Sequence, residues 1–167
     1  MAREGAHPGS RWRGARGEWY VAGQAVLMVL VFLGPRRWAG WPGWAFPARP
    51  VAMAAGLPLM AGGLALFVAG AVRLGTRLTP LPHPKPGATL VETGPYRLVR
   101  HPIYGGGILA AFGWAWMTRS WCTLAYAALL AIFLDIKARR EERWLADQFP
   151  GYGDYRRRVR KLIPFIY

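Results

Sequence analysis

The sequence predicts an all-α fold, an integral membrane helical bundle with about four transmembrane helices and a cytoplasmic C-terminal helical extension. Hydrophobic residues make up 53% of the 167 residues, and most of them gather in four apolar runs. Of the 22 Lys and Arg residues, 18 fall in three segments outside these runs, at 1–18, 73–102 and 137–167. Apolar runs bounded by clustered positive charge are typical of membrane-spanning helices.

The four runs place the expected spans at about 19–34, 51–72, 102–118 and 120–136. The second run has no charged residue over its 22 positions, enough to cross a hydrocarbon core of about 30 Å. The last two runs are shorter, and they need flanking polar residues that snorkel or a locally thinned bilayer. Because only a few polar residues separate them, we interpret this pair as a transmembrane hairpin.

Both ends of the chain are expected to differ from the bundle. Residues 1–18 form a basic N-terminal tail, and residues 19–167 form the membrane domain. Arginines ahead of the first apolar run resemble a secretory signal, but we expect that run to be retained as an anchor. Beyond the last span, helical periodicity continues through Asp135–Gln148, and cytoplasmic helices are predicted over 137–163.

The charge distribution decides between two classes of protein. A net charge of +14 is also typical of nucleic-acid binding, but no soluble domain is left to carry that function. Positive residues on one side of an even number of spans predict that both termini are cytoplasmic, in a plasma or inner membrane. That face would attract the anionic headgroups of membrane lipids. The single cysteine, Cys122, excludes an intramolecular disulfide, and we expect no metal site.

The chemistry is predicted where two polar clusters flank the hairpin. The first, residues 94–107, has a Gly-Pro turn, an expected helix start and three successive glycines, which suit close approach of a ligand to the backbone. The second covers residues 135–145. Because a short hairpin returns the chain to the same side of the membrane, we expect these clusters to be neighbours. Together they contribute Tyr96, Arg100, His101, Tyr104, Lys137, Arg140, Glu141 and Glu142.

The motif at residues 90–104, with Arg-His-Pro-x-Tyr at its end, and the later Glu-Glu-x-x-Leu at 141–145 resemble the isoprenylcysteine carboxyl methyltransferase superfamily. That superfamily includes the phospholipid N-methyltransferases, and the resemblance covers roughly residues 75–165. It implies S-adenosylmethionine as cofactor and a lipid-like or membrane-dissolved methyl acceptor as partner.

The resemblance also implies site residues. It places seven residues around the cofactor, namely Leu90, Val91, Gly94, Tyr96, His101, Pro102 and Tyr104, and it matches Glu141 to an acidic cofactor contact. Four positions before Glu141 the family typically has an arginine facing the acceptor, where this chain has Lys137. Some members have a histidine where this chain has Ala88.

The residues themselves agree with methyl transfer. A sulfonium donor carries its own leaving group, so the protein needs only to align the reactants and exclude water. The predicted helix start can bind the donor's carboxylate with help from His101 or Arg100, and Tyr96 or Tyr104 can lie against adenine. Glu141 and Glu142 can accept from ribose hydroxyls or an ammonium. We predict Lys137, Arg140 and Glu142 as the catalytic residues.

Structural interpretations stay open beside these. His101 could be a helix cap at the membrane interface, and the acidic pair could be a solvated face. Tyr152 and Tyr155 are expected to anchor the tail to headgroups, and Asp135 to pair with Arg139 or line the site. Two other functions also remain: an NADPH-dependent membrane reductase of related architecture, and a non-enzymatic basic membrane protein.

Overall fold

The computed structural model describes residues 18–40, 44–75 and 89–167. The predicted basic tail, apart from its last residue, and Ala88 therefore lie outside the described residues. The described part forms five α-helices and one 3₁₀ turn: α1 (Glu18–Leu33), α2 (Arg49–Leu74), η2 (Gly94–Arg97), α3 (Pro102–Thr118), α4 (Trp121–Gln148) and α5 (Tyr152–Arg158). The all-α prediction is confirmed over these residues, where the only β pairing is an isolated bridge.

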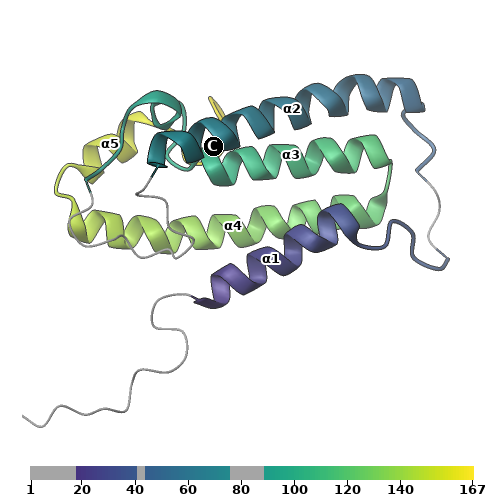
Figure 1. Cartoon of the computed structure of the whole chain (residues 1–167), viewed down its shortest axis with the longest axis horizontal. Coiled ribbons are helices and arrows are strands. Elements are labelled where there is room, and N and C mark those ends of the chain that lie inside the picture. The colour runs from purple at the N-terminus through teal and green to yellow at the C-terminus, as the bar shows by residue number, and fades with distance from the viewer. Residues whose placement is uncertain (1–17, 41–43, 76–88) are drawn as a thin grey trace, which may run out of the picture.

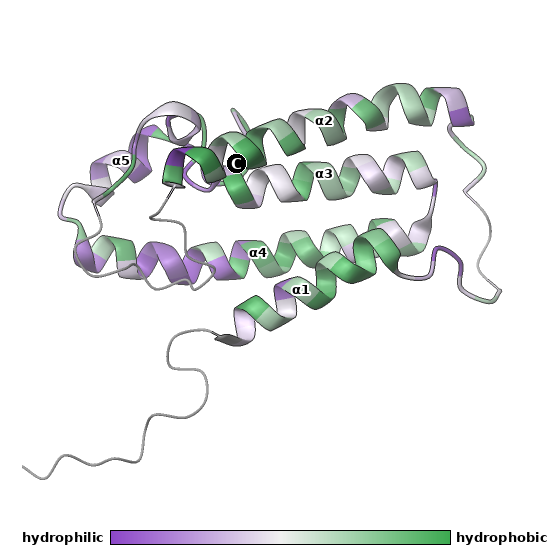
Figure 2. Cartoon of the chain, in the orientation of Figure 1, coloured by the Kyte–Doolittle hydropathy of each residue, from purple (hydrophilic) through white to green (hydrophobic). Residues whose placement is uncertain are grey.

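The four long helices run along the long axis of the molecule, and α5 caps the end at which α3 begins (Figure 1). Hydrophobic residues fill the middle of these helices, whereas the last turns of α4 and all of α5 are largely hydrophilic (Figure 2). Two of the helices, α2 and α4, are long and apolar enough to cross a membrane by length and composition. The other two, α1 and α3, are shorter, with 16 and 17 residues.

Glycines let α2 and α3 pack with their backbones in contact. A Cβ at Gly63 would lie 2.6 Å from the Gly106 carbonyl oxygen, and one at Gly106 would lie 2.5 Å from the Gly63 carbonyl oxygen. Gly56 and Gly113 repeat the arrangement nearer the other end of the helices. Small residues at such intervals are how membrane helices approach closely. Gly56 and Gly63 of α2 therefore let α3 approach closely.

A second layer is formed by α1 and α4 against α3. Its buried residues come from all three helices and from the C-terminal segment: Val31, Ile108, Ala111, Ala115, Ala127, Leu130, Leu134 and Leu162. By contrast, α2 leaves large apolar side chains such as Leu57, Val68 and Val72 exposed. An apolar outer surface is costly in water, so this face fits contact with lipid.

The C-terminal extension differs in part from the prediction. As predicted, α4 continues through Asp135 to Gln148 without a break. The second helix, however, ends at Arg158, so the expectation of helix as far as residue 163 is wrong. Residues 160–161 instead run beside the start of α3, where the Arg160 and Lys161 carbonyls accept from the backbone N–H groups of Arg100 and His101 at 2.8 and 3.0 Å. Those donors precede a helix and need acceptors from elsewhere.

Candidate functional site

Glu142 is the centre of a buried ion-pair network that joins three segments of the chain. Its Oε1 accepts from Arg100 Nε at 2.8 Å and lies 3.2 Å from His101 Nε2, while Arg156 Nε lies 3.8 Å from its Oε2. Burial alone would raise the pKa of Glu142, but hydrogen bonds from His101 and Arg100 outweigh it and lower the pKa to about 2. The carboxylate is therefore ionised at neutral pH and holds the start of α3 against α4.

His101 faces this acidic pair and does not cap its helix. It occupies the N-cap position of α3, but its side chain makes no capping hydrogen bond. The imidazole is 6% exposed, its Nδ1 lies 3.8 Å from Glu141 Oε2, and its ring stacks on Tyr104 with centroids 5.5 Å apart. The alternative of a simple cap is thus wrong. The ring instead sits between two carboxylates and an aromatic face.

Glu141 is the more accessible of the two acids. Its side chain is 26% exposed, and its Oε2 accepts from the Tyr104 hydroxyl at 3.0 Å. The Lys137 ammonium lies 5.0 Å from the centre of the Tyr104 ring and donates to Gln24 Oε1 of α1 at 2.7 Å. A phenol of α3 and a carboxylate and a buried ammonium of α4 therefore lie next to one another, and α1 contributes the amide of Gln24.

The 3₁₀ turn η2 holds Tyr96 beneath this cluster. Gly94 begins η2 with a φ of +64°, a conformation that favours glycine. The Tyr96 hydroxyl donates to the Gly70 carbonyl of α2 at 3.4 Å, and the Tyr96 carbonyl accepts from the Tyr155 hydroxyl at 2.7 Å. Burial, with a smaller effect of the Glu141 charge, raises the pKa of Tyr96 well above its usual value, so this phenol stays neutral.

The C-terminal segment closes the site from outside. Arg100 donates to the carbonyls of Arg156 and Val159, and the Leu162 carbonyl presses on Gly105, where a Cβ could not fit. Asp135 pairs with Arg139 at 2.7 Å, as expected, and also with Lys161.

Two of the three successive glycines are needed for close packing, and the third faces open space. Gly105 is needed for contact with the C-terminal segment, and Gly106 for contact with α2. A Cβ at Gly107, by contrast, would meet nothing within 4 Å. The idea that all three glycines admit a ligand is therefore wrong for the first two, and it remains a prediction for Gly107.

The structure brings together most, but not all, of the predicted site residues. Arg100, His101, Tyr104, Glu141 and Glu142 are in direct contact, and Lys137 and Tyr96 adjoin them. The remaining cofactor-binding predictions lie close by in the chain: Pro102 is buried against Gly70, and Leu90 and Val91 are half-buried ahead of η2.

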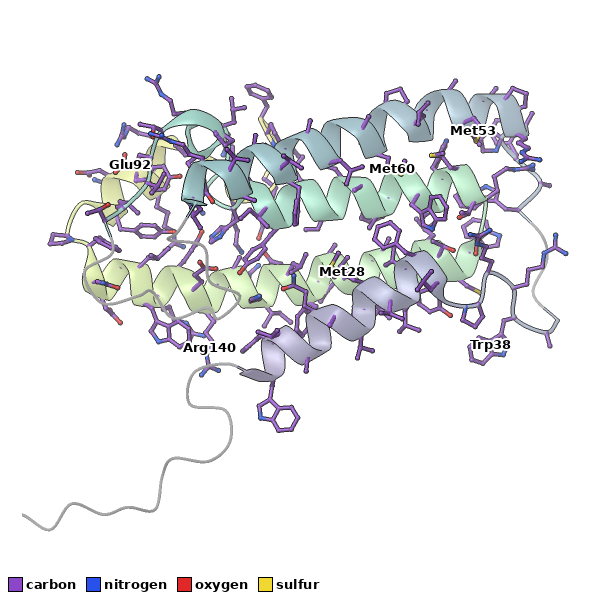
Figure 3. All side chains as sticks on the ribbon, in the orientation of Figure 1. Met28, Trp38, Met53, Met60, Glu92 and Arg140 are labelled. Carbon is purple, nitrogen blue, oxygen red and sulfur yellow. The ribbon has the colours of Figure 1, made fainter. Side chains whose placement is uncertain are left out.

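Arg140 lies away from this cluster. Its guanidinium packs over the rings of Tyr20 and Trp144, at 5.6 and 5.2 Å. Figure 3 shows it on the side of α4 that faces away from α3.

Sequence reasoning missed three participants. Arg156 reaches Glu142, Gln24 binds Lys137, and Tyr152 is 1% exposed with a buried hydroxyl that has no partner among the described residues. The expected headgroup role of Tyr152 and Tyr155 is wrong, because both rings are buried. Gln24 carried a signal, since it is the polar residue that interrupts the first apolar run.

A hollow of about 440 Å³ opens beside Arg100 and Glu142 and is lined mainly by basic residues of the C-terminal segment. A larger cavity lies at the opposite end of the bundle, far from these residues. In the described ranges, no three His, Cys, Asp or Glu side chains gather as metal ligands would.

Comparison with known proteins identifies the kind of chain this is. A family model described as phospholipid methyltransferase matches residues 51–151. Cobalt-zinc-cadmium resistance protein CzcN of Cupriavidus metallidurans is 33% identical over 152 residues, which cover 89% of this chain and 62% of that protein.

Two further relatives match shorter regions. Methanethiol S-methyltransferase 1 of Bradyrhizobium diazoefficiens is 41% identical over 71 residues, 42% of this chain and 24% of that protein. Steroid 5-alpha-reductase DET2 of Gossypium hirsutum is 35% identical over 81 residues, 48% of this chain and 31% of that protein. The chain thus spans less than two thirds of the length of each of these relatives.

Proposed function

Because this chain belongs to the phospholipid methyltransferase family, within the isoprenylcysteine carboxyl methyltransferase superfamily, we propose that it is an integral membrane methyltransferase that uses S-adenosylmethionine. Its acceptor is a lipid-like or membrane-dissolved carboxylate, amine or thiol. The observation that carries the proposal is the contact of Tyr104 and His101 with Glu141 at the polar end of an apolar bundle.

The residues present fit the cofactor. S-adenosylmethionine carries a carboxylate, an ammonium, ribose hydroxyls and a sulfonium, whose methyl group it supplies as an electrophile. Glu141 is partly accessible and can accept from a hydroxyl or an ammonium. The Tyr152 hydroxyl, buried without a partner among the described atoms, offers a donor for a carboxylate, and Gly107 leaves the backbone uncovered.

Each residue then has a role that follows from its contacts. Glu142 is a positioning residue, because its carboxylate is already occupied by Arg100 and His101. Lys137 is the acceptor-side residue, since its buried ammonium lies beside Tyr104 and can orient an anionic group. If the acceptor is an amine or a thiol, Glu141 would accept its proton; the bound cofactor would supply the methyl carbon by cleavage of its methyl–sulfur bond and leave as a neutral thioether. Arg140 contacts rings of α1 and α4, so we give it no part in this step.

The proposed topology has four spans, α1 to α3 and the apolar part of α4 up to residue 136. Both termini and the cluster around Glu142 then lie on the cytoplasmic side. The support is the two long apolar helices, the family membership and the charge distribution. Methyl transfer requires a site that excludes water. A site at the membrane boundary suits an acceptor that is dissolved in the bilayer.

Calorimetry with S-adenosylhomocysteine tests the cofactor assignment on the purified full chain. We expect binding to the parent and a loss of about tenfold or more in Glu141→Gln, the effect of losing one charge-assisted hydrogen bond. The matched control is Asp147→Asn, an exposed acid on the same helix, which should bind like the parent. Absence of binding to the parent would reject the assignment.

Transfer of labelled methyl groups from S-adenosylmethionine then identifies the acceptor. A lipid extract, a prenylcysteine analogue and methanethiol present an amine, a carboxylate and a thiol. We expect label in one of these classes, and Lys137→Met to reduce transfer most strongly for a carboxylate. Label in none of the three would count against the proposed acceptors.

The match to a steroid reductase favours a second candidate, an NADPH-dependent membrane reductase. The same calorimetry separates the two functions. Binding of NADPH, with no competition from S-adenosylhomocysteine, would replace the methyltransferase by the reductase.

A further inference from the structure

A cavity lies at the end of the bundle opposite the candidate site. It has a volume of about 650 Å³ and is bounded by the end of α3, the starts of α2 and α4, and the segment after α1. Figure 3 places Trp38 and Met53, two of its lining residues, at this end. Because α3 is 17 residues long, about 25 Å separates the two ends of the bundle. A molecule held here is therefore not in the place of the methyl acceptor.

Four arginines line this cavity: Arg36, Arg37, Arg49 and Arg119. They are the only Lys and Arg residues outside the three basic segments. The chain has no Asp or Glu between Glu18 and Glu92, nor between Glu92 and Asp135. Among the described residues, accordingly, none of these four guanidinium groups forms a salt bridge, whereas Arg100 and Arg139 at the other end are paired. Four arginines that form no salt bridge among the described residues therefore line one cavity.

Two of the four guanidinium groups are held in place and keep donors free. Arg119 donates from Nη2 to the carbonyls of Trp44 and Ala45, at 2.7 and 2.9 Å, and its buried Nε has no partner among the described atoms. Arg36 lies over the Trp114 ring at 5.3 Å, and the Trp114 Nε1 is also buried without a partner. Planar guanidinium groups with free donors suit the tetrahedral oxygens of a phosphate group.

The rest of the wall is apolar and continues to the outer surface. Trp44 and Trp121 stack with ring centroids 4.8 Å apart, and Met53 completes the lining on the α2 side. Val51 and Leu57, near Met53 in the sequence of α2, are exposed on the outside of the bundle. Indole rings are enriched where a membrane meets water, at the level of the lipid headgroups. The cavity thus presents cations to a headgroup and apolar surface to the chains attached to it.

We propose that this cavity binds the phosphate of an anionic phospholipid in the leaflet opposite the candidate site. Four unpaired arginines favour a headgroup with net negative charge over a zwitterionic one, whose ammonium they would repel. The apolar wall favours a lipid over free phosphate. The proposal rests on the membrane placement given above but not on methyl transfer, so either function can fail without the other.

Native mass spectrometry of the detergent-purified full chain, with thermal unfolding measured in parallel, tests the proposal. The probes are phosphatidylglycerol, phosphatidylcholine and inorganic phosphate. The variant is Arg36→Gln/Arg49→Gln, which removes two charges from exposed positions, and the control is Arg143→Gln, an exposed arginine near the other end. We expect phosphatidylglycerol to be retained by the parent and to raise its unfolding temperature. In the double variant only, the affinity for phosphatidylglycerol should fall at least tenfold.

Other outcomes would overturn the proposal. Equal retention of phosphatidylcholine would remove the need for net negative charge. Stabilisation by inorganic phosphate as great as that by phosphatidylglycerol would make the site one for free anions. Equal loss in Arg143→Gln would show general attraction of a basic protein to acidic lipid. Binding of S-adenosylhomocysteine should be the same in the parent, the double variant and Arg143→Gln. A failure of the lipid proposal can then be distinguished from a failure of the methyltransferase proposal.

Discussion

At the scale of single residues, Glu142 should contribute most to stability. Replacing it in Glu142→Gln removes the negative charge but leaves Arg100 buried beside it, and losing one partner of a buried ion pair costs about 3 kcal/mol or more. Denaturant unfolding of the detergent-solubilised protein measures the change. The control is Asp154→Asn, which breaks the exposed pair with Arg157 and should cost less than about 1 kcal/mol. Equal losses in the two variants would contradict a special role for Glu142.

The same carboxylate predicts how stability depends on pH. The pKa of Glu142 is about 2 in the folded state against an ordinary value of 4.5, so the unfolded chain binds the proton more tightly. Its stabilising contribution is therefore complete above about pH 4.5 and is lost as the pH falls towards 2. Unfolding midpoints of the parent should fall faster than those of Glu142→Gln over this range. Parallel curves for the two proteins would show that another group governs the acid response.

Some of these residue contacts could be predicted from the sequence, and others could not. The meeting of His101 with Glu141 and Glu142 followed from two motifs on either side of a short hairpin, because a hairpin must bring its ends together. Arg156 could not be predicted, since one arginine in a basic segment looks like its neighbours. Which arginine of this segment reaches Glu142 depends on how the chain folds around α5.

At the scale of the helices, neighbouring glycines of α2 should differ in what they tolerate. Gly63→Ala places a methyl group 2.5–2.6 Å from the backbone of α3, so we expect a loss of about 1–3 kcal/mol through overpacking. Gly62→Ala, where nothing lies within 4 Å, should be neutral or slightly stabilising. Thermal unfolding followed by circular dichroism compares the two. If Gly62→Ala were the more damaging, the packing of α2 on α3 described above would be wrong.

The limits of helices α2, α3 and α4 were predictable because their signals are local. Pro102 marks the start of α3, and the apolar run beginning after residue 50 is unbroken by charge. The end of α5 was not predictable in this way. Residues 159–163 keep an apolar spacing that fits a helix, but the carbonyls of Arg160 and Lys161 instead accept from the N–H groups of Arg100 and His101. A local pattern carries no information about such distant donors.

At the scale of the whole molecule, the proposed topology predicts which ends can be labelled from outside an intact cell. In a Cys122→Ala background, Ala39→Cys lies in the exposed segment between α1 and α2, and Gln148→Cys lies at the exposed end of α4. A membrane-impermeant maleimide should label the first in intact cells and the second only after permeabilisation. Labelling of both from the same side would refute the three spans proposed between the two positions, and with them the opposite placement of the cluster around Glu142.

The uninterrupted course of α4 has a consequence for how reactants arrive. At 1.5 Å per residue, Glu141 stands about 30 Å from Trp121 along the axis, close to the depth of the oily layer itself. In the proposed topology, a site at that height borders both the bilayer and the aqueous phase. Under the proposed function, a membrane-dissolved acceptor would reach this site from within the bilayer, and the water-soluble cofactor would reach it from the aqueous side. Neither reactant has to leave the phase in which it dissolves before the two meet.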